Sequence, residues 1–310
     1  DIGSTILVYR LSRTYLSEKI SVLAGLIVAA SPVLISISGF HGNTDPVFIF
    51  LTLLSVYLFL VKKNLLFAGL VFGLSLNIKI VPIVCVPFFF FFSQTWRDRF
   101  TFFASAAFPV IAGFSYNLMK DFTGITTNVF LYKSRAHIWG LTKVTEWYDP
   151  TTMDSKLRLC ILVLLVTFSW ILSRRARIAI NEQERIRHSL TAFGLVFLTF
   201  LVFSPGFGVQ YLSWIVPTAI FLGCYWSICY NVIAGTFLFS VYTYWSKGFP
   251  WYNADSDVVG QWRGVSETLD LLTWLFMLIW LFSVVLRAFI IQYLIEDDEQ
   301  LIQNKNNGLL

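Results

Sequence analysis

Charge is what this sequence has least of. Only 13% of its 310 residues are Asp, Glu, Lys or Arg, against roughly 25% in an average soluble domain. The hydrophobic residues, 56% of the chain, come in long runs that are almost free of charge. This pattern excludes a soluble globular fold and predicts an all-α, polytopic transmembrane helical bundle of about 9–10 membrane segments, including short helices. The net charge of +5 gives no support to a nucleic-acid partner, because membrane proteins have basic cytoplasmic loops anyway.

The residues that usually carry chemistry are also scarce. There are three histidines and four cysteines, and no spacing among them is that of a zinc site or a disulfide framework. The sequence contains no phosphate-binding glycine-rich loop and no nucleophile elbow. No metal site is therefore predicted. The chain starts with Asp, and the apolar run 2–9 has the length of the end of a spanning helix. We therefore expect an N-terminally truncated chain that lacks at least one helix and the loop after it.

Lys and Arg in the short loops predict the orientation of the bundle. The segments 10–19, 62–63, 97–99 and 174–187 hold 12 basic residues against 4 acidic ones, and we place them in the cytoplasm. The loops 40–46, 119–158, 204–211 and 247–267 have no positive bias, which places them outside the cell or in a lumen. Residues 1–293 would form the membrane domain, and 294–310 a cytoplasmic polar tail.

Two apolar blocks must each cross the membrane twice for this orientation to hold. The block 65–93 is interrupted at Lys79 and Pro82, so we predict two short helices with Lys79 near their tip, and one long tilted helix is the alternative. The block 212–245 is predicted to fold as an in-and-out pair that turns near residues 224–231.

The exterior loops supply the candidate site residues. His41, Asn43 and Asp45 lie between two apolar runs and could bind a polar substrate, although Asp45 could equally be a helix cap. Lys79 costs on the order of 3 kcal/mol at the bilayer centre, so it must snorkel, pair or face a polar cavity. Because the sequence pattern identifies no carboxylate partner for it, we favour a bound phosphate.

Four further residues extend the candidate site. Lys133 and Arg135 form a close basic pair among aromatic residues, which suits phosphate binding or an interfacial aromatic belt. A proline and two glycines in the stretch 204–208 prevent a continuous helix there. The stretch is followed by Gln210 and Tyr211, which could contact substrate. Arg263 in the last loop could bind a phosphate. Loops that share one face can build an enzyme site or line the vestibule of a transporter.

Three stretches resemble a known superfamily. Gly39 to Leu53, Ala68 to Pro82 and Phe207 to Trp214 are similar, in that order, to segments of the GT-C glycosyltransferases that use polyprenyl-phosphate sugars. The resemblance implies a hexosyltransferase that moves mannose or glucose from a dolichyl- or undecaprenyl-type phosphate to a hydroxyl of a lipid-linked, protein or glycan acceptor.

The resemblance also implies inversion at the anomeric carbon and a carboxylate base in the first exterior loop, which we expect this chain to lack. It leaves a divalent metal open, and it implies a multi-pass location in the plasma membrane or the endoplasmic reticulum membrane. The alternatives are a secondary transporter or a lipid flippase. A transporter should show an internal repeat and polar residues at the midplane, and neither is evident.

Overall fold

The structure is a computed structural model that describes residues 1–130, 137–145 and 150–291, and within these ranges every regular element is helical. Among the described residues, six helices are long and apolar enough to cross a membrane: Glu18–His41, Trp96–Lys120, Met153–Ile178, Glu182–Phe203, Cys224–Trp245 and Val265–Ala288. Four shorter apolar helices accompany them: Asp45–Leu60, Leu65–Ile78, Val81–Phe92 and Val209–Leu222. The predicted all-α polytopic bundle is confirmed.

The elements follow one another along the chain, and a long connection separates Cys224–Trp245 from Val265–Val285. They are α1 (Ile2–Ser12), α2 (Glu18–Ala29), α3 (Pro32–Ile35), η1 (Ser36–His41), α4 (Asp45–Leu60), α5 (Leu65–Ile78), η2 (Val81–Cys85), α6 (Val86–Phe92), α7 (Trp96–Lys120), α8 (Phe122–Ile125), η3 (Thr126–Phe130), α9 (Gly140–Val144), α10 (Pro150–Ile178), α11 (Glu182–Phe203), η4 (Val209–Tyr211), α12 (Leu212–Ala219), η5 (Ile220–Leu222), α13 (Cys224–Trp245), α14 (Val265–Val285) and η6 (Leu286–Ile291).

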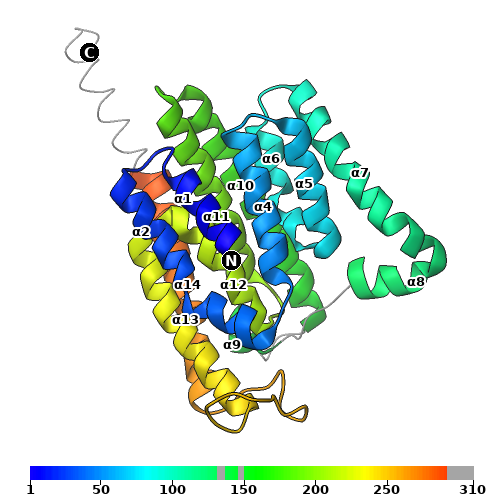
Figure 1. Ribbon diagram of the computed structural model, residues 1–310, viewed down its shortest axis with the longest axis vertical. Coiled ribbons are helices and arrows are strands. Elements are labelled where there is room, and N and C mark those ends of the chain that lie inside the picture. Colours follow the sequence, from blue (N-terminus) through cyan, green and yellow to red (C-terminus); the bar gives the residue numbers. More distant parts are fainter. Residues whose placement is uncertain (131–136, 146–149, 292–310) are drawn as a thin grey trace.

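The connections gather at two opposite ends of the bundle (Figure 1). Those between α1 and α2, α4 and α5, α6 and α7, and α10 and α11 lie at the upper end of the view, whereas α9 and the α13–α14 connection lie at the lower end. The segments expected in the cytoplasm thus share one end. Which end faces the cytoplasm stays a prediction.

Both predicted helix pairs are present. α5 ends at Ile78, Lys79 has an extended backbone (φ −154°, ψ 135°), and η2 begins at Val81 with Pro82 in its first turn. This break excludes the single long tilted helix. The second turn lies at Gly223, whose φ of 142° favours glycine, so the predicted turn at 224–231 was placed just too late.

The prediction of one long loop over residues 119–158 is wrong in part. The short elements α8, η3 and α9 occupy much of it, and α10 begins at Pro150. Apolar length cannot reveal such a polar helix end, which is stabilised by an ion pair between Asp154 and Arg158 one turn apart. That i, i+4 spacing was the available signal.

Close packing of α5 on α7 sets the position of Lys79. A Cβ at Gly69 would lie 2.2 Å from the carbonyl oxygen of Phe102, and one at Gly73 would lie 2.2 Å from that of Ala106. Small residues at both positions therefore let the two backbones meet, as in other membrane helix pairs. The glycines of α5 thus fix the helix that ends just before Lys79.

Candidate functional site

Asp45, the first residue of α4, is the centre of a buried polar cluster at the lower end of the bundle in Figure 1. Its Oδ1 accepts a hydrogen bond from Lys79 Nζ at 2.7 Å, and its Oδ2 accepts one from Trp214 Nε1 at 2.7 Å. Its backbone N–H donates to Asn43 Oδ1 at 3.0 Å. The Asp45 side chain is only 1% exposed. Both carboxylate oxygens are therefore occupied. The side chain that accepts a hydrogen bond from the first backbone N–H of α4 is that of Asn43.

Lys79 has the carboxylate partner that sequence reasoning did not find. It comes from α4, 34 positions earlier in the chain. Its ammonium also lies 5.2 Å from the ring centre of Tyr211 and 5.1 Å from that of Trp214, where cation–π attraction adds to the ion pair. The side chain stays 26% exposed. Among the described residues Asp45 is its one hydrogen-bond acceptor, so two of its three N–H donors remain available.

An apolar cavity of about 370 Å³ adjoins this cluster. Ile80, the residue after Lys79, lines it together with Tyr211 and Trp214. Arg158 of α10 also reaches its lining. Sequence reasoning missed Arg158, because it had assigned the residue to a solvated loop. The cavity therefore has apolar walls with Arg158 in its lining, and the Lys79 ammonium lies over the rings of two of its wall residues, Tyr211 and Trp214.

The remaining predicted site residues do not all join this cluster. His41 Nδ1 lies 3.1 Å from the hydroxyl of Tyr242, against α13. Gln210 is half-buried in η4, next to Tyr211, and Arg263 is exposed in the α13–α14 connection. Lys133 and Arg135 lie outside the described residues. The structure thus brings Asn43, Asp45, Lys79 and Tyr211 together, and His41 lies close enough to Asp45 and Lys79 for their charges to act on it.

A second buried aspartate, Asp270 of α14, was missed altogether. Lys143 Nζ lies 2.9 Å from both of its carboxylate oxygens, and Trp262 Nε1 donates to Oδ2 at 2.6 Å. Lys143 Nζ also lies 3.4 Å from the carbonyl oxygen of Glu267. A carboxylate inside the apolar run 268–293 is costly unless it is paired, and this was the signal that could have identified it.

Aromatic residues attach α9 to the rest of the bundle. The Trp139 ring stacks on Phe207 at 3.9 Å between centroids, and its Nε1 donates to the carbonyl oxygen of Leu201 at 3.0 Å. Trp274 Nε1 donates to the next carbonyl, that of Val202, at 2.9 Å. These contacts fix the segment that follows α11 and leads to Tyr211.

The described residues do not suit a divalent metal. In the ranges covered by the structure, no three His, Cys, Asp or Glu side chains come together as a ligand set. Asp45 and Asp270 already accept from a lysine and a tryptophan each.

The helical bundle and the polar cluster at one of its ends define a multi-pass membrane protein with a candidate enzyme site. The profile of glycosyltransferase family 87 matches residues 3–205, about two thirds of the chain. The chain belongs to this family and is a membrane glycosyltransferase, with a sugar donor and an acceptor as substrates. This confirms the resemblance to GT-C enzymes. Comparisons with curated proteins and with solved structures give no match.

Proposed function

We propose that this chain transfers a hexose, mannose or glucose, from a polyprenyl-phosphate donor to an acceptor hydroxyl at the exterior or lumenal face of the membrane. The observation that carries the proposal is the position of Lys79, an ammonium with unused donors next to an apolar cavity. A polyprenyl-phosphate sugar has the complementary chemistry, because an anion is joined to a long hydrocarbon chain. Glycosyltransferase family membership favours transfer over transport.

The phosphate would bind at Lys79, and the first part of the prenyl chain would enter the cavity beside it. Asp45 fixes the ammonium without using all of its donors. Tyr211 and Trp214 contribute to the cavity wall and face the ammonium. Arg158 supplies a second cation at the cavity lining, where it can form a charge-assisted hydrogen bond with phosphate. Arg263, Lys133 and Arg135 stay candidate phosphate ligands.

The reaction would be a single inverting displacement. The acceptor oxygen bonds to the anomeric carbon, the bond from that carbon to the phosphate oxygen breaks, and the lipid phosphate leaves with the electron pair. Lys79 offsets the charge that develops on this leaving group. A carboxylate base takes the hydroxyl proton. Asp45 is poorly suited to this step because both of its oxygens are occupied. His41, Asn43, Gln210 and Tyr211 are the candidates for orienting sugar or acceptor.

The test is sugar transfer by protein reconstituted in lipid, supplied with polyprenyl-phosphate mannose or glucose. We expect Lys79→Met to raise the donor KM by at least about tenfold, since a hydrogen bond to a charged group contributes about 1.5–3 kcal/mol. Lys143→Met is the matched control, because Lys143 also pairs with a buried aspartate beside a tryptophan. Its donor KM should stay within about twofold.

The same assay can contradict the proposal. Transfer from a nucleotide sugar, but from neither lipid donor, would overturn the donor class. If Lys79→Met does not fold, Lys79→Arg retains the charge beside Asp45 but moves the N–H groups. A donor KM that stays unchanged in this folded variant would remove Lys79 from the phosphate site.

A further inference from the structure

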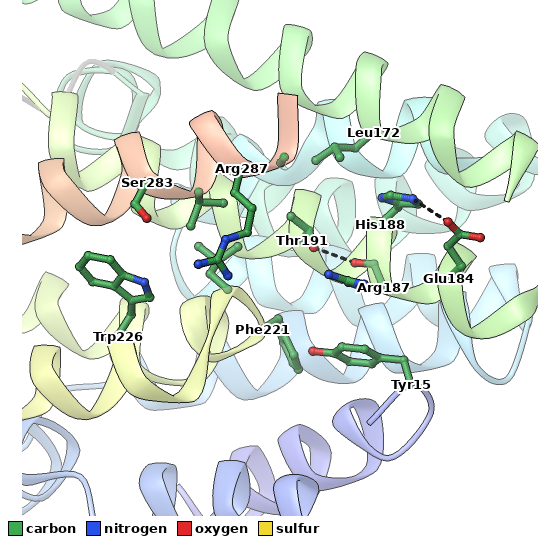
Figure 2. Close-up of a pocket in the computed structure, with 13 residues that line it drawn as sticks. Tyr15, Leu172, Glu184, Arg187, His188, Thr191, Phe221, Trp226, Ser283 and Arg287 are labelled. Carbon is green, nitrogen blue, oxygen red and sulfur yellow. Dashed lines mark hydrogen bonds and ion pairs between the residues drawn. The ribbon is translucent and has the colours of Figure 1, made fainter. Parts of the chain in front are cut away.

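A second cavity, lined in part by charged side chains, lies at the opposite end of the bundle from Asp45. It has a volume of about 210 Å³ and lies between α11, α13, α14 and the connection from α1 to α2. Figure 2 shows its lining residues. The connection from α1 to α2 is at the upper end of Figure 1, whereas the Asp45 cluster is near the lower end. The cavity is therefore separate from the proposed transfer site.

Two arginines give this cavity its charge. Arg187 comes from α11 and Arg287 from η6, and both guanidinium groups point into the space between the helices (Figure 2). In the part of the chain that the structure describes, neither forms an ion pair with a carboxylate. Two like charges that share one cavity repel each other, and a bound anion would remove that repulsion.

The one acidic side chain of the lining does not neutralise the arginines. Glu184 Oε1 lies 3.8 Å from His188 Nε2, and its Oε2 accepts a hydrogen bond from the backbone N–H of Ile180 at 3.2 Å. Its carboxylate is thus engaged within the start of α11. The balance of charge inside the cavity remains positive.

A phenol and apolar walls complete the cavity. Tyr15 also lines the cavity, and Figure 2 shows its hydroxyl beside the Phe221 ring. Burial raises the pKa of Tyr15, so its hydroxyl keeps the proton and can donate it in a hydrogen bond. Phe221, Trp226 and Leu172 form apolar walls, and the two arginines are themselves exposed, so a ligand can reach them from solvent.

We propose that this cavity binds a phosphate group, either the headgroup of an anionic phospholipid or a soluble phosphate. Guanidinium groups bind phosphate through paired, parallel N–H bonds, and the cavity offers two of them with one phenol. Basic pockets between membrane helices on the cytoplasmic side bind anionic lipid headgroups, and this end of the bundle is the one predicted to be cytoplasmic. The site is independent of the transfer reaction and would stabilise the packing of α11 against α14.

The test measures thermal unfolding of the full chain in a neutral detergent. One series adds inorganic phosphate, a second adds a short-chain phosphatidic acid, and phosphatidylcholine is the uncharged comparison. A ligand that binds only the folded state raises the unfolding temperature in a saturable way. We expect such a rise with phosphatidic acid or with inorganic phosphate, and a loss of at least about tenfold in apparent affinity in Arg187→Gln and in Arg287→Gln.

A matched variant separates a site from general surface charge. Arg10→Gln combined with Arg97→Gln removes two exposed arginines that do not line the cavity, and its affinity should stay unchanged. A rise with inorganic phosphate alone identifies a soluble ligand, and a rise with phosphatidic acid only identifies a headgroup. The proposal fails if neither ligand gives a saturable rise, or if the control variant loses as much affinity as the cavity variants.

Conservative variants keep the test decisive where a glutamine variant does not fold. Arg187→Lys and Arg287→Lys retain the positive charge but lose the paired N–H geometry. Each should bind several-fold more weakly while unfolding at the temperature of the unaltered chain when no ligand is present. Affinity that is unchanged in both lysine variants would contradict binding through the guanidinium groups.

Discussion

Two lysines at the same end of the bundle face a buried aspartate that also accepts a tryptophan N–H, but they differ in the donors that remain. Lys79 meets Asp45 and Trp214, and Lys143 meets Asp270 and Trp262. Both aspartate side chains are 1% exposed, and the lysines are 26% and 23% exposed. Residue types and burial are therefore nearly the same in the two clusters.

The difference lies in what each ammonium can still bind. Lys143 is directed at both oxygens of Asp270 and at the carbonyl of Glu267, which uses its three donors. Lys79 is directed at one oxygen of Asp45 and otherwise faces the rings of a tyrosine and a tryptophan that line the cavity. The Lys143–Asp270 cluster attaches α9 to α14, whereas the Lys79–Asp45 cluster leaves an ammonium with donors for a ligand. The same three residue types, lysine, aspartate and tryptophan, can thus form a structural contact in which every donor is used, or one that leaves lysine donors unused.

The largest expected effect comes from removing each aspartate charge. Asp45→Asn and Asp270→Asn each leave a mostly buried lysine without its counter-ion, which should lower the free energy of unfolding by about 3 kcal/mol, near the low end of the usual range because the lysines keep some exposure. Only Asp45→Asn should also reduce turnover of the folded fraction, by about tenfold or more, since it releases Lys79. Unfolding in detergent and transfer per folded molecule measure the two effects.

The distinction between the two clusters fails if Asp45→Asn and Asp270→Asn have the same effect on turnover. Equal loss of turnover in folded Asp270→Asn would mean that the Lys143 cluster also acts in the reaction. Full turnover in folded Asp45→Asn would mean that Lys79 does not need Asp45 for its proposed function. A Glu267→Gln variant serves as a control, because Lys143 contacts the carbonyl of this residue and not its side chain.

A smaller effect is expected from the tryptophans. Trp214→Phe and Trp262→Phe each remove one N–H that donates to a carboxylate, so each should lower the free energy of unfolding by about 1.5–3 kcal/mol. Trp214→Phe also weakens the aromatic contact with Lys79 and changes the cavity wall, so it should raise the donor KM several-fold. Trp262→Phe should leave the donor KM unchanged, and a comparable rise there would remove the distinction between the clusters.

The helical bundle could be predicted because long apolar runs and basic loops report directly on membrane crossing. The break at Lys79 and Pro82 was predictable for the same reason, since proline and a charge interrupt one run. The pairing of Lys79 with Asp45 was not, because it joins residues from two helices whose contact depends on packing across the bundle. The polar start of α10 was not predicted either, because helices were placed by the length of their apolar runs.

Asp270 illustrates a signal that was present in the sequence but was not used. A carboxylate in an apolar run indicates a buried partner, yet the partner, Lys143, lies in a segment where no apolar pattern predicts the short helix α9. The stacking of Trp139 on Phe207 likewise joins two loops that are far apart in the chain. Contacts of this kind depend on tertiary packing and leave no local periodicity to read.

A third Lys–Asp pair gives the smallest expected effect and sharpens the comparison. Lys247 Nζ lies 2.5 Å from Asp255 Oδ2 at the surface of the α13–α14 connection, and Lys247 is exposed. The hydrogen bond between them lowers the pKa of Asp255 and raises the pKa of Lys247. Asp255 therefore contributes stability above its ordinary pKa, and this is lost as pH falls through the lowered value. Lys247 contributes below its ordinary pKa, and this is lost as pH rises through the raised one.

The pair should thus be intact across neutral pH, and yet Lys247→Met should not measurably change the unfolding temperature. Water and salt screen this pair because the Lys247 side chain is 72% exposed, whereas Asp45 and Asp270 are shielded by the bundle. Unfolding scans at low salt and at about 1 M salt would check this. A large, salt-sensitive loss in Lys247→Met, equal to that in Asp270→Asn, would show that charge pairing alone sets these effects. Burial would then not be what makes the two aspartate clusters important.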